Sequence, residues 1–247
     1  MTVKNTENEG NFNTEEAEYS DLYPSRKKSQ SKISTWFDKI TLNKERESYQ
    51  KLQCEINVFQ CMKKSPLMKL LLGALKSSGC EVELGRHISC EVCDEVVTGG
   101  YDPQTNQIII CQNTANSRNR VHSTLSHEMI HMFDYCRNKL DLQNLNHLAC
   151  TEIRAANQCH CSFLGAWVQG TASPFNIKKA HQNCVIDKAV RSVIAITNIS
   201  KEEATEVVMQ VFNKCYNDLE PIGRRLRRNS LDMEKAYYDG IYYGYID

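Results

Sequence analysis

The sequence lacks an excess of charge of either sign and lacks any long apolar run. Its 247 residues contain 30 Lys and Arg and 30 Asp and Glu, so the formal net charge is +0. This balance gives no general attraction for nucleic acid, and we expect no nucleic-acid partner. The most apolar stretch, residues 67–75, is interrupted by Lys69 and is much shorter than the roughly 20 residues of a membrane-spanning helix. Any membrane contact is therefore expected to be peripheral.

The N-terminal region also lacks a recognisable targeting leader. Residues 1–22 have neither the apolar core of a secretory signal nor the basic, acid-poor composition of a mitochondrial presequence. Residues 1–40 are polar and mixed in charge, which is typical of a disordered segment. Residues 221–247 place several arginines ahead of a run rich in tyrosine, and we expect a flexible tail there. One domain is therefore expected between these segments, over residues 41–220.

Cysteine, by contrast, is abundant, with 12 residues. In an ordinary cytosolic protein these would be reduced thiols or metal ligands, whereas an oxidising compartment would pair them in disulfides. A cysteine-rich chain without a cleavable leader indicates either import by oxidative trapping or a reduced cytosolic protein. Cys90-x-x-Cys93 has the spacing of half a zinc site, of a redox pair or of two disulfide ends. The disulfide interpretation is favoured, because the only other close pair, Cys159-x-Cys161, is distant and one residue too tight.

The remaining pattern predicts an α+β fold. Residues 81–88 and 108–110 are strand-like and flank the turn signals Gly99-Gly100 and Asp102-Pro103, which indicates a small antiparallel sheet. His181, a lone histidine near one predicted helix, could donate a hydrogen bond to a transition state, but it is expected to be structural or solvated. Helical periodicity and capping residues predict helices over 44–64, from Ser65-Pro66 to Gly79, over 177–197 and after Ser200.

The stretch from Leu125 to Asp134 carries the chemistry, because it contains H-E-x-x-H within a helical pattern. His127 and His131 lie four residues apart and project from one helix face, as shared coordination of a zinc ion (Zn2+) requires. Glu128 is placed to act as the catalytic general base of a metalloprotease. The alternative is a degenerate or purely structural motif, since short motifs also match by chance.

A third metal ligand is expected from the next helix. Glu152 lies 21 positions after His131 and can complete a His/His/Glu set that leaves one position for water. Asp134 and His147 compete for this role, although Asp134 is better suited to orienting an imidazole. The third histidine of metzincins is excluded, because Arg137 occupies that position.

Several motifs occur in a fixed order along the chain. They are Cys90-x-x-Cys93, Ile110-Cys111-Gln112-Asn113, the stretch from Thr124 to Asp134, the stretch from Ala149 to Ala155, and His181-Gln182-x-Cys184-Val185. Together they resemble one family, the mitochondrial inner membrane proteases that also act as ATP synthase assembly chaperones. The similarity runs from about Cys54 to Leu219.

This resemblance implies a single zincin-like α+β metalloprotease domain, stapled by disulfides, on the intermembrane-space side of the mitochondrial inner membrane. It implies removal of the N-terminal leader from the precursor of ATP synthase subunit 6, assistance in assembling that subunit into Fo, and import by the intermembrane-space thiol-oxidation relay. It carries over His127 and His131 as zinc ligands and Glu128 as the catalytic residue. Two rivals remain: a non-proteolytic assembly chaperone with a structural or vestigial zinc site, and a reduced cytosolic metalloprotein.

Overall fold

The computed structural model describes residues 37–93, 97–161, 176–227 and 230–246. Residues 44–247 form one compact unit, and residues 1–43 form a separate one. The segment predicted to be disordered, residues 1–40, lies outside the described residues except for its last four. Those four begin helix α2 (Phe37–Lys64). The following description concerns the larger unit.

Helix α3 (Pro66–Ser77) begins where its sequence predicts. Ser65 caps it by accepting a hydrogen bond from the Met68 amide at 3.4 Å, and Pro66 occupies the first turn, where no amide donor is needed. Gly79 follows the helix with φ of 85°, a left-handed conformation that glycine adopts without steric cost. Local chemistry therefore sets both ends of this helix.

The sheet has three strands in the order β1-β3-β2, namely β1 (Ile88–Glu91), β2 (Gly99–Asp102) and β3 (Gln107–Cys111). β2 and β3 are antiparallel, with Tyr101 opposite Ile108, as the turn between them predicts. β1 runs parallel to β3, so the sheet is mixed and not wholly antiparallel as expected. The α+β class is confirmed. The parallel pair arises because the chain places β2 at the far edge before β3 returns to the centre, and local turn signals do not specify that order.

The strand predicted at residues 81–88 is shifted. Leu84–His87 forms the short helix α4, and extended structure begins only at Ile88. The His87 ring stabilises this turn, because its Nδ1 accepts a hydrogen bond from the Glu83 amide at 2.9 Å. A side chain thus satisfies a backbone donor that a strand would have paired with its neighbour.

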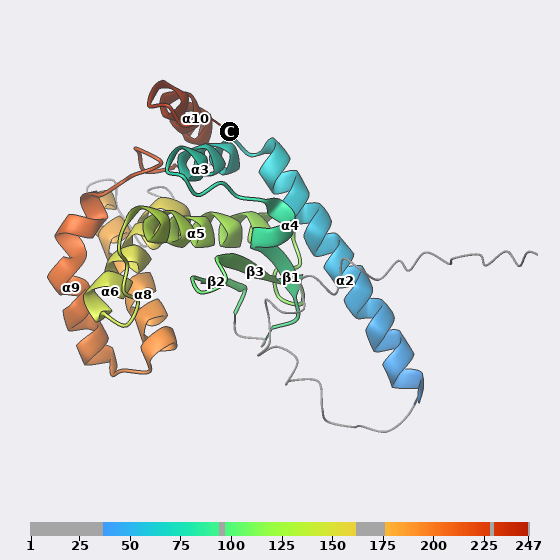
Figure 1. Ribbon diagram of the computed structural model, residues 1–247. Coiled ribbons are helices and arrows are strands. Elements are labelled where there is room, and N and C mark those ends of the chain that lie inside the picture. The colour runs from blue at the N-terminus through green and yellow to red at the C-terminus, as the bar shows by residue number, and fades with distance from the viewer. Residues whose placement is uncertain (1–36, 94–96, 162–175, 228–229, 247) are drawn as a thin grey trace, which may run out of the picture. The chain divides into compact units, whose positions relative to one another are not determined.

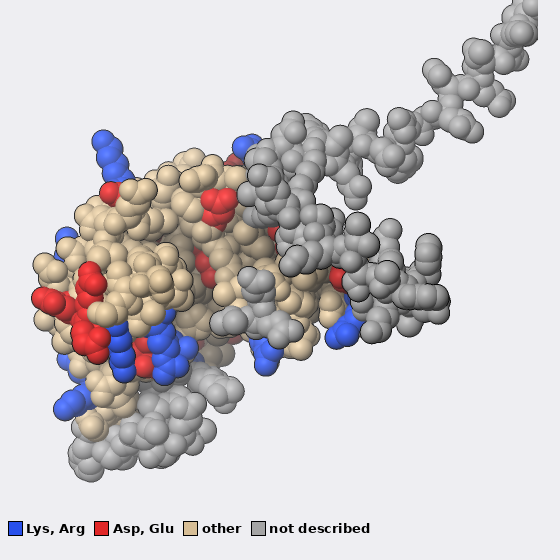
Figure 2. Space-filling view, turned by 90° about the horizontal axis from the view of Figure 1, so that it is seen from below, with Lys and Arg blue, Asp and Glu red and all other residues tan. Residues whose placement is uncertain are grey.

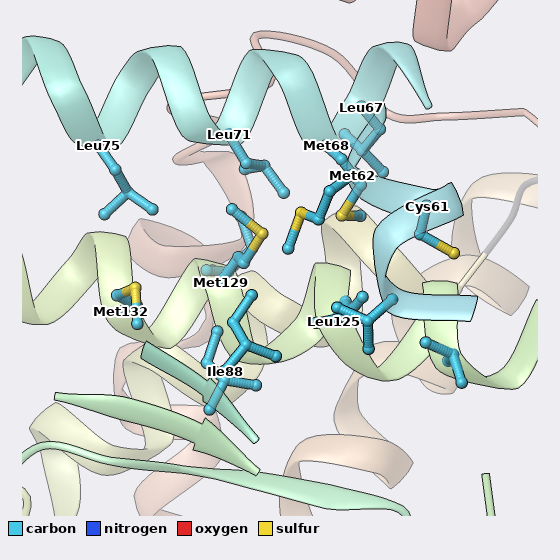
Figure 3. Close-up of a cluster of buried hydrophobic side chains, with 14 of the residues drawn as sticks. Cys61, Met62, Leu67, Met68, Leu71, Leu75, Ile88, Leu125, Met129 and Met132 are labelled. Atoms are coloured by element: carbon cyan, nitrogen blue, oxygen red, sulfur yellow. The ribbon is translucent and has the colours of Figure 1, made fainter. Parts of the chain in front are cut away.

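Helix α5 (Arg118–Arg137) lies between α3 and the sheet (Figure 1). Figure 3 shows Leu71 of α3 directed toward Met129 of α5, with Ile88 of β1 on the opposite side of that helix. These residues belong to one buried cluster, which we call the first core. Burying one such side chain contributes about 1.5–3 kcal/mol, so several together hold α5 firmly in place. The first core includes Leu67, Met68, Leu71, Leu75, Ile108, Ile110, Leu125, Met129 and Phe133.

A second buried cluster, which we call the second core, is formed by three further helices and a π-helical turn. These are α6 (Leu145–Ala155), the turn η3 (Ala156–His160), α8 (Ile177–Thr197) and α9 (Lys201–Asn217). Ser200 caps α9 by accepting a hydrogen bond from the Glu203 amide at 3.1 Å, as predicted. The second core includes Leu148, Ile153, Val185, Val193, Val208 and Phe212.

The C-terminal residues differ from the predicted flexible tail, because they fold onto α3. Helix α10 (Asp232–Tyr242) lies along α3 in Figure 1. A Cβ on Gly240 would stand 2.2 Å from Leu70 Cδ1, so a larger residue there would force the buried Leu70 side chain to move. Tyr237 and Tyr245 pack against the first core. Two of the tyrosines that suggested a loose appendage therefore supply packing surface, which composition alone does not indicate, whereas Tyr238, Tyr242 and Tyr243 are exposed.

Ten of the 12 cysteines form disulfides, and Cys61 and Cys159 are free. Cys90 and Cys93 bond to different partners, which confirms the disulfide interpretation of Cys90-x-x-Cys93. The five pairs are Cys54–Cys90, Cys80–Cys136, Cys93–Cys111, Cys150–Cys215 and Cys161–Cys184.

The surface agrees with the charge balance of the sequence. On the face shown in Figure 2, basic and acidic side chains occur beside one another. Across the described ranges, no helix combines the length and apolar character that would let it cross a bilayer.

Candidate metal centre

Two imidazoles from α5 meet at one point. The Nε2 atoms of His127 and His131 lie 3.0 Å apart, and their ring planes are nearly perpendicular. The helical spacing of four residues produces this convergence, because residues i and i+4 lie above one another on one face. Two neutral imidazoles directing Nε2 toward a common point are a typical donor pair for a transition metal.

Glu152 of α6 approaches the same point from the opposite side. One carboxylate oxygen lies 3.5 Å from His127 Nε2, and the other lies 3.5 Å from His131 Nε2. Ligand atoms 2.0–2.1 Å from a tetrahedral zinc ion stand about 3.3 Å apart. The three donors therefore fit zinc with shifts of a few tenths of an ångström.

Two carboxylates are close enough to compete for such an ion. Ligand atoms of His127, Glu128 and His131 lie within 4.8 Å of one another, which makes Glu128 a geometric candidate. However, Glu128 accepts a hydrogen bond from the Tyr101 backbone amide of β2, whereas Glu152 spans both imidazoles. We regard Glu152 as the better placed ligand, because a single carboxylate contacts both Nε2 atoms.

The two carboxylates also differ in acidity. Burial raises the pKa of Glu128 to about 7, and the nearby charge of Glu152 adds to this effect. Burial alone would raise the pKa of Glu152 too, but His131, His127 and a hydrogen bond from Ser192 together lower it to about 2. Glu152 thus remains an anion, as a ligand should, whereas Glu128 can exchange a proton near neutral pH.

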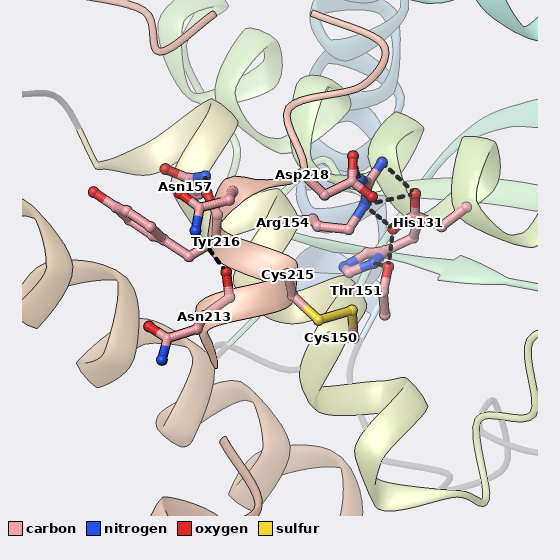
Figure 4. The surroundings of a disulfide bond; sticks show 11 residues. His131, Cys150, Thr151, Arg154, Asn157, Asn213, Cys215, Tyr216 and Asp218 are labelled. Carbon is pink, nitrogen blue, oxygen red and sulfur yellow. Dashed lines mark hydrogen bonds and ion pairs between the residues drawn. A yellow bond between two sulfur atoms is a disulfide. The ribbon is translucent and has the colours of Figure 1, made fainter. Parts of the chain in front are cut away.

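A chain of hydrogen bonds fixes the His131 ring (Figure 4). The Thr151 hydroxyl donates to Asp134 Oδ2 at 2.7 Å, so its oxygen accepts from His131 Nδ1 at 2.9 Å. Arg154 holds Asp134 in turn, with Nε 3.0 Å from each carboxylate oxygen. Because Nδ1 carries the proton, the lone pair of His131 Nε2 is directed to the metal position.

The candidate centre opens into a cleft of about 520 Å³. Strand β2 borders it, because β2 is the edge strand of the sheet. A Cβ on Gly99 would stand 2.5 Å from both the Ile109 carbonyl oxygen and Thr124 Cγ2, so glycine permits β2 to pack directly on α5. This close packing brings the edge of β2 alongside Glu128.

The structure brings together the four residues singled out in the sequence, His127, Glu128, His131 and Glu152. The competitors of Glu152 lie elsewhere. Asp134 contacts Thr151 and Arg154, and His147 is exposed, with Nδ1 3.2 Å from the Asp141 amide.

His181 also lies away from the cleft, as its expected structural role requires. It is buried between the Tyr216 hydroxyl at 2.9 Å and the Cys161 carbonyl oxygen at 2.8 Å. The sequence did not indicate two residues that do line the cleft, His160 and Ser192.

His160 ends η3, and its ring centroid is 4.7 Å from that of His127. Burial and the charge of His127 lower the pKa of His160 to about 3, so it faces the centre as a neutral imidazole. π-Helical turns occur often at functional sites, but no sequence pattern marks them.

Comparison with known proteins places these observations in a family. The profile of the peptidase M76 family matches residues 52–223. The mitochondrial inner membrane protease ATP23 homolog of Danio rerio is 44% identical over 76% of this chain and 74% of its own length. The Homo sapiens homolog is 43% identical over 76% of this chain and 80% of its own. The Schizosaccharomyces pombe protease atp23 is 39% identical over 70% of this chain and 93% of its own. No solved structure gives a significant match.

The family profile covers the H-E-x-x-H helix, the helices of the second core and the first core except for the part that α10 supplies. The resemblance seen in the sequence motifs is thereby confirmed. This chain is a peptidase and belongs to the peptidase M76 family.

Proposed function

We propose that this peptidase is a zinc-dependent endopeptidase whose metal is held by His127, His131 and Glu152. The observation that supports this most directly is the position of the Glu152 carboxylate, 3.5 Å from each Nε2 atom. A bound zinc ion supplies Lewis-acid polarisation of the scissile carbonyl. All three donors come from packed helices, which suits a site that must keep its geometry during turnover.

Glu128 acts as the general base in this proposal. Its carboxylate borders the cleft, and its pKa of about 7 matches proton transfer at neutral pH. Glu128 takes a proton from the attacking water and returns it to the leaving amine. The Tyr101 amide orients the carboxylate, since it donates a hydrogen bond to it.

The edge of β2 holds the substrate in this proposal. Gly99, Gly100 and Tyr101 line the cleft beside Glu128. An extended peptide that pairs with this edge places one of its peptide bonds next to the metal position, because strand pairing fixes the peptide backbone along its whole length. The backbone then provides affinity, and the cleft selects side chains.

The cellular part of the proposal rests on the relatives and on the cysteines. The relatives are named mitochondrial inner membrane proteases. Five disulfides suit an oxidising compartment. We propose that the chain is imported by the thiol-oxidation relay and acts peripherally on the intermembrane-space side of the inner membrane. Its substrate would be the leader of the ATP synthase subunit 6 precursor, and it would also assist assembly of that subunit into Fo.

The test is Glu128→Gln, compared with Glu202→Gln, an exposed glutamate on α9. We expect Glu128→Gln to lower peptide cleavage by a factor of about 10²–10⁴ while retaining one zinc per chain, because only the base is lost. Mass spectrometry of subunit 6 from cells should then show the uncleaved leader, and the Glu202 variant should behave as the wild type.

Each outcome decides between the proposed roles. Full cleavage by the Glu128 variant would contradict the mechanism, and absence of zinc from the wild type would contradict the metal. Normal processing of subunit 6 in cells that contain only the Glu128 variant would contradict that substrate. Assembly without processing would assign the assembly role to another surface of the same protein.

A further inference from the structure

Helix α2 carries an exposed apolar stripe in addition to its buried face. Cys54, Val58, Cys61 and Met62 are between 2% and 8% exposed and join the first core. On another face, Tyr49, Leu52, Ile56 and Phe59 are 64%, 53%, 38% and 56% exposed. These four residues, which we call the α2 stripe, are separated by three, four and three positions, the heptad spacing of helices that pair side by side. None of the four lines the cleft.

The α2 stripe ends in opposite charges. Glu45 lies four residues before Tyr49, and Lys63 lies four residues after Phe59, so both continue the heptad pattern. Both side chains are exposed, and Lys63 Nζ lies 5.6 Å from the Phe59 ring centroid. The spacing from Glu45 to Lys63 is therefore four, three, four, three and four, which reads the same in both directions.

This symmetry makes the stripe complementary to itself when two copies run antiparallel. Tyr49 then faces Phe59 of the other copy, Leu52 faces Ile56, and Glu45 faces Lys63, and each contact occurs twice. A parallel pair would instead place Glu45 against Glu45 and Lys63 against Lys63. We propose that the α2 stripe is a homodimer interface in which two α2 helices pack antiparallel about a two-fold axis near residue 54.

The same features argue against a lipid occupant. A helix that lies on an anionic membrane has basic residues along its polar border. The borders of the α2 stripe carry both signs, because Arg46 and Gln53 lie on one side and Ser48, Lys51 and Glu55 lie on the other. An anionic lipid surface would repel Glu45, which lies in line with the stripe, whereas an antiparallel pair places Glu45 against Lys63 of the other copy.

The interface should be weak. The stripe covers about 18 residues, which form a helix roughly 27 Å long. One helix of this length buries less surface than the roughly 800 Å² per partner of a standard interface. Glu55, beside the stripe, would also meet its own copy close to the axis. We therefore expect a dissociation constant of about 10 µM and a monomer–dimer equilibrium that depends on concentration.

Sedimentation velocity of the full-length, oxidised protein from roughly 1 to 200 µM measures this equilibrium. We expect Leu52→Glu to weaken dimerisation by about a hundredfold, because it buries a charge in each copy. Met209→Glu, an equally exposed apolar position on α9, is the control and should have no effect. Glu55→Gln should strengthen association. A monomeric wild type at 200 µM, or a dimer that Leu52→Glu leaves intact, would overturn the proposal.

Charge exchange tests the antiparallel direction. Glu45→Lys or Lys63→Glu alone should weaken the dimer by about fivefold or more, since two ion pairs are lost by symmetry, and the double exchange should restore it. A zero-length carbodiimide cross-link between Glu45 and Lys63 gives an independent measurement. Within one helix these side chains are about 27 Å apart, so such a cross-link can form only between copies. Binding of the stripe to cardiolipin vesicles in place of dimerisation would contradict the proposal.

Discussion

The two cores on either side of the metal centre differ in what they contribute to it. The first core positions His127, Glu128 and His131 on one helix. The second core positions Glu152, on a helix that α8 and α9 support. We call the segments that build the first core the first region and those that build the second core the second region. Three disulfides lie within the first region and two within the second, and none of these five joins the two regions. Each region is therefore covalently stapled, whereas the centre between them depends on non-covalent contacts.

A buried ion pair links the two regions directly. Arg154 of α6 lies 2.8 Å from Asp134 of α5, and both residues are 5% exposed or less. The Thr151 hydroxyl belongs to the same network and also orients His131. This network therefore both joins the two regions and orients a metal-site histidine, so a disturbance of the network should be measurable at the metal centre.

The largest expected effect comes from Glu152→Gln, which removes the carboxylate ligand that the second region supplies to the metal centre. We expect cleavage to fall by at least about a thousandfold, with loss of bound metal, because an amide is a weak ligand for zinc. Glu203→Gln, in the first turn of α9, is the control. Metal content by mass spectrometry and peptide cleavage should fall together. Retention of full metal by Glu152→Gln would assign the third ligand to Glu128 instead.

Features set by the local sequence were predicted in both regions, since α8 and the Ser200 cap of α9 also follow their signals. Ser65-Pro66, the H-E-x-x-H spacing and the turn at Asp102-Pro103 are local signals, and the structure follows each of them. Glu152 was identified only from its distance of 21 positions after His131 in the sequence. The packing of α6 against α5 is what brings its carboxylate to both histidines.

His160, Ser192 and the folded C-terminal helix were missed, because each depends on contacts between segments distant in the sequence. His160 reaches His127 through a π-helical turn that no composition marks. Ser192 lies on α8 and reaches Glu152 of α6 by a hydrogen bond. Helix α10 is held in place by contacts with α3, such as that of Gly240 with Leu70. The order of the strands depends on the same kind of contact.

Disulfide removal should distinguish the regions by stability. Cys150–Cys215 closes 65 residues of the second region, and Cys93–Cys111 closes 18 residues of the first. Replacing Cys150 and Cys215 by serine should lower the free energy of unfolding by about 4 kcal/mol, and replacing Cys93 and Cys111 should lower it by about 3 kcal/mol. Hydrogen exchange should show α6 and α9 opening in the Cys150→Ser/Cys215→Ser variant while α3 and α5 remain protected. Equal opening of both regions would show that they unfold as one.

The smallest effect concerns pH and two histidines, one from each region, of which His181 is buried and His122 is half-buried. Burial lowers the pKa of His181 in the second region and of His122 in the first, whose Nε2 lies 2.8 Å from Ser65 Oγ. Because the unfolded chain binds the proton first, the contribution of these two histidines to the free energy of unfolding is constant above about pH 6.5. It falls below that pH by at most about 1.4 kcal/mol per pH unit for each histidine. His181 is 1% exposed and already satisfies both ring nitrogens as a neutral group, so a second proton would bury a charge and reverse its hydrogen bond with Tyr216. We therefore expect His181→Gln to flatten the pH dependence between pH 7 and 5 more than His122→Gln does. Urea unfolding across this range measures the difference, and a larger effect of His122→Gln would place the acid-sensitive contact in the first region.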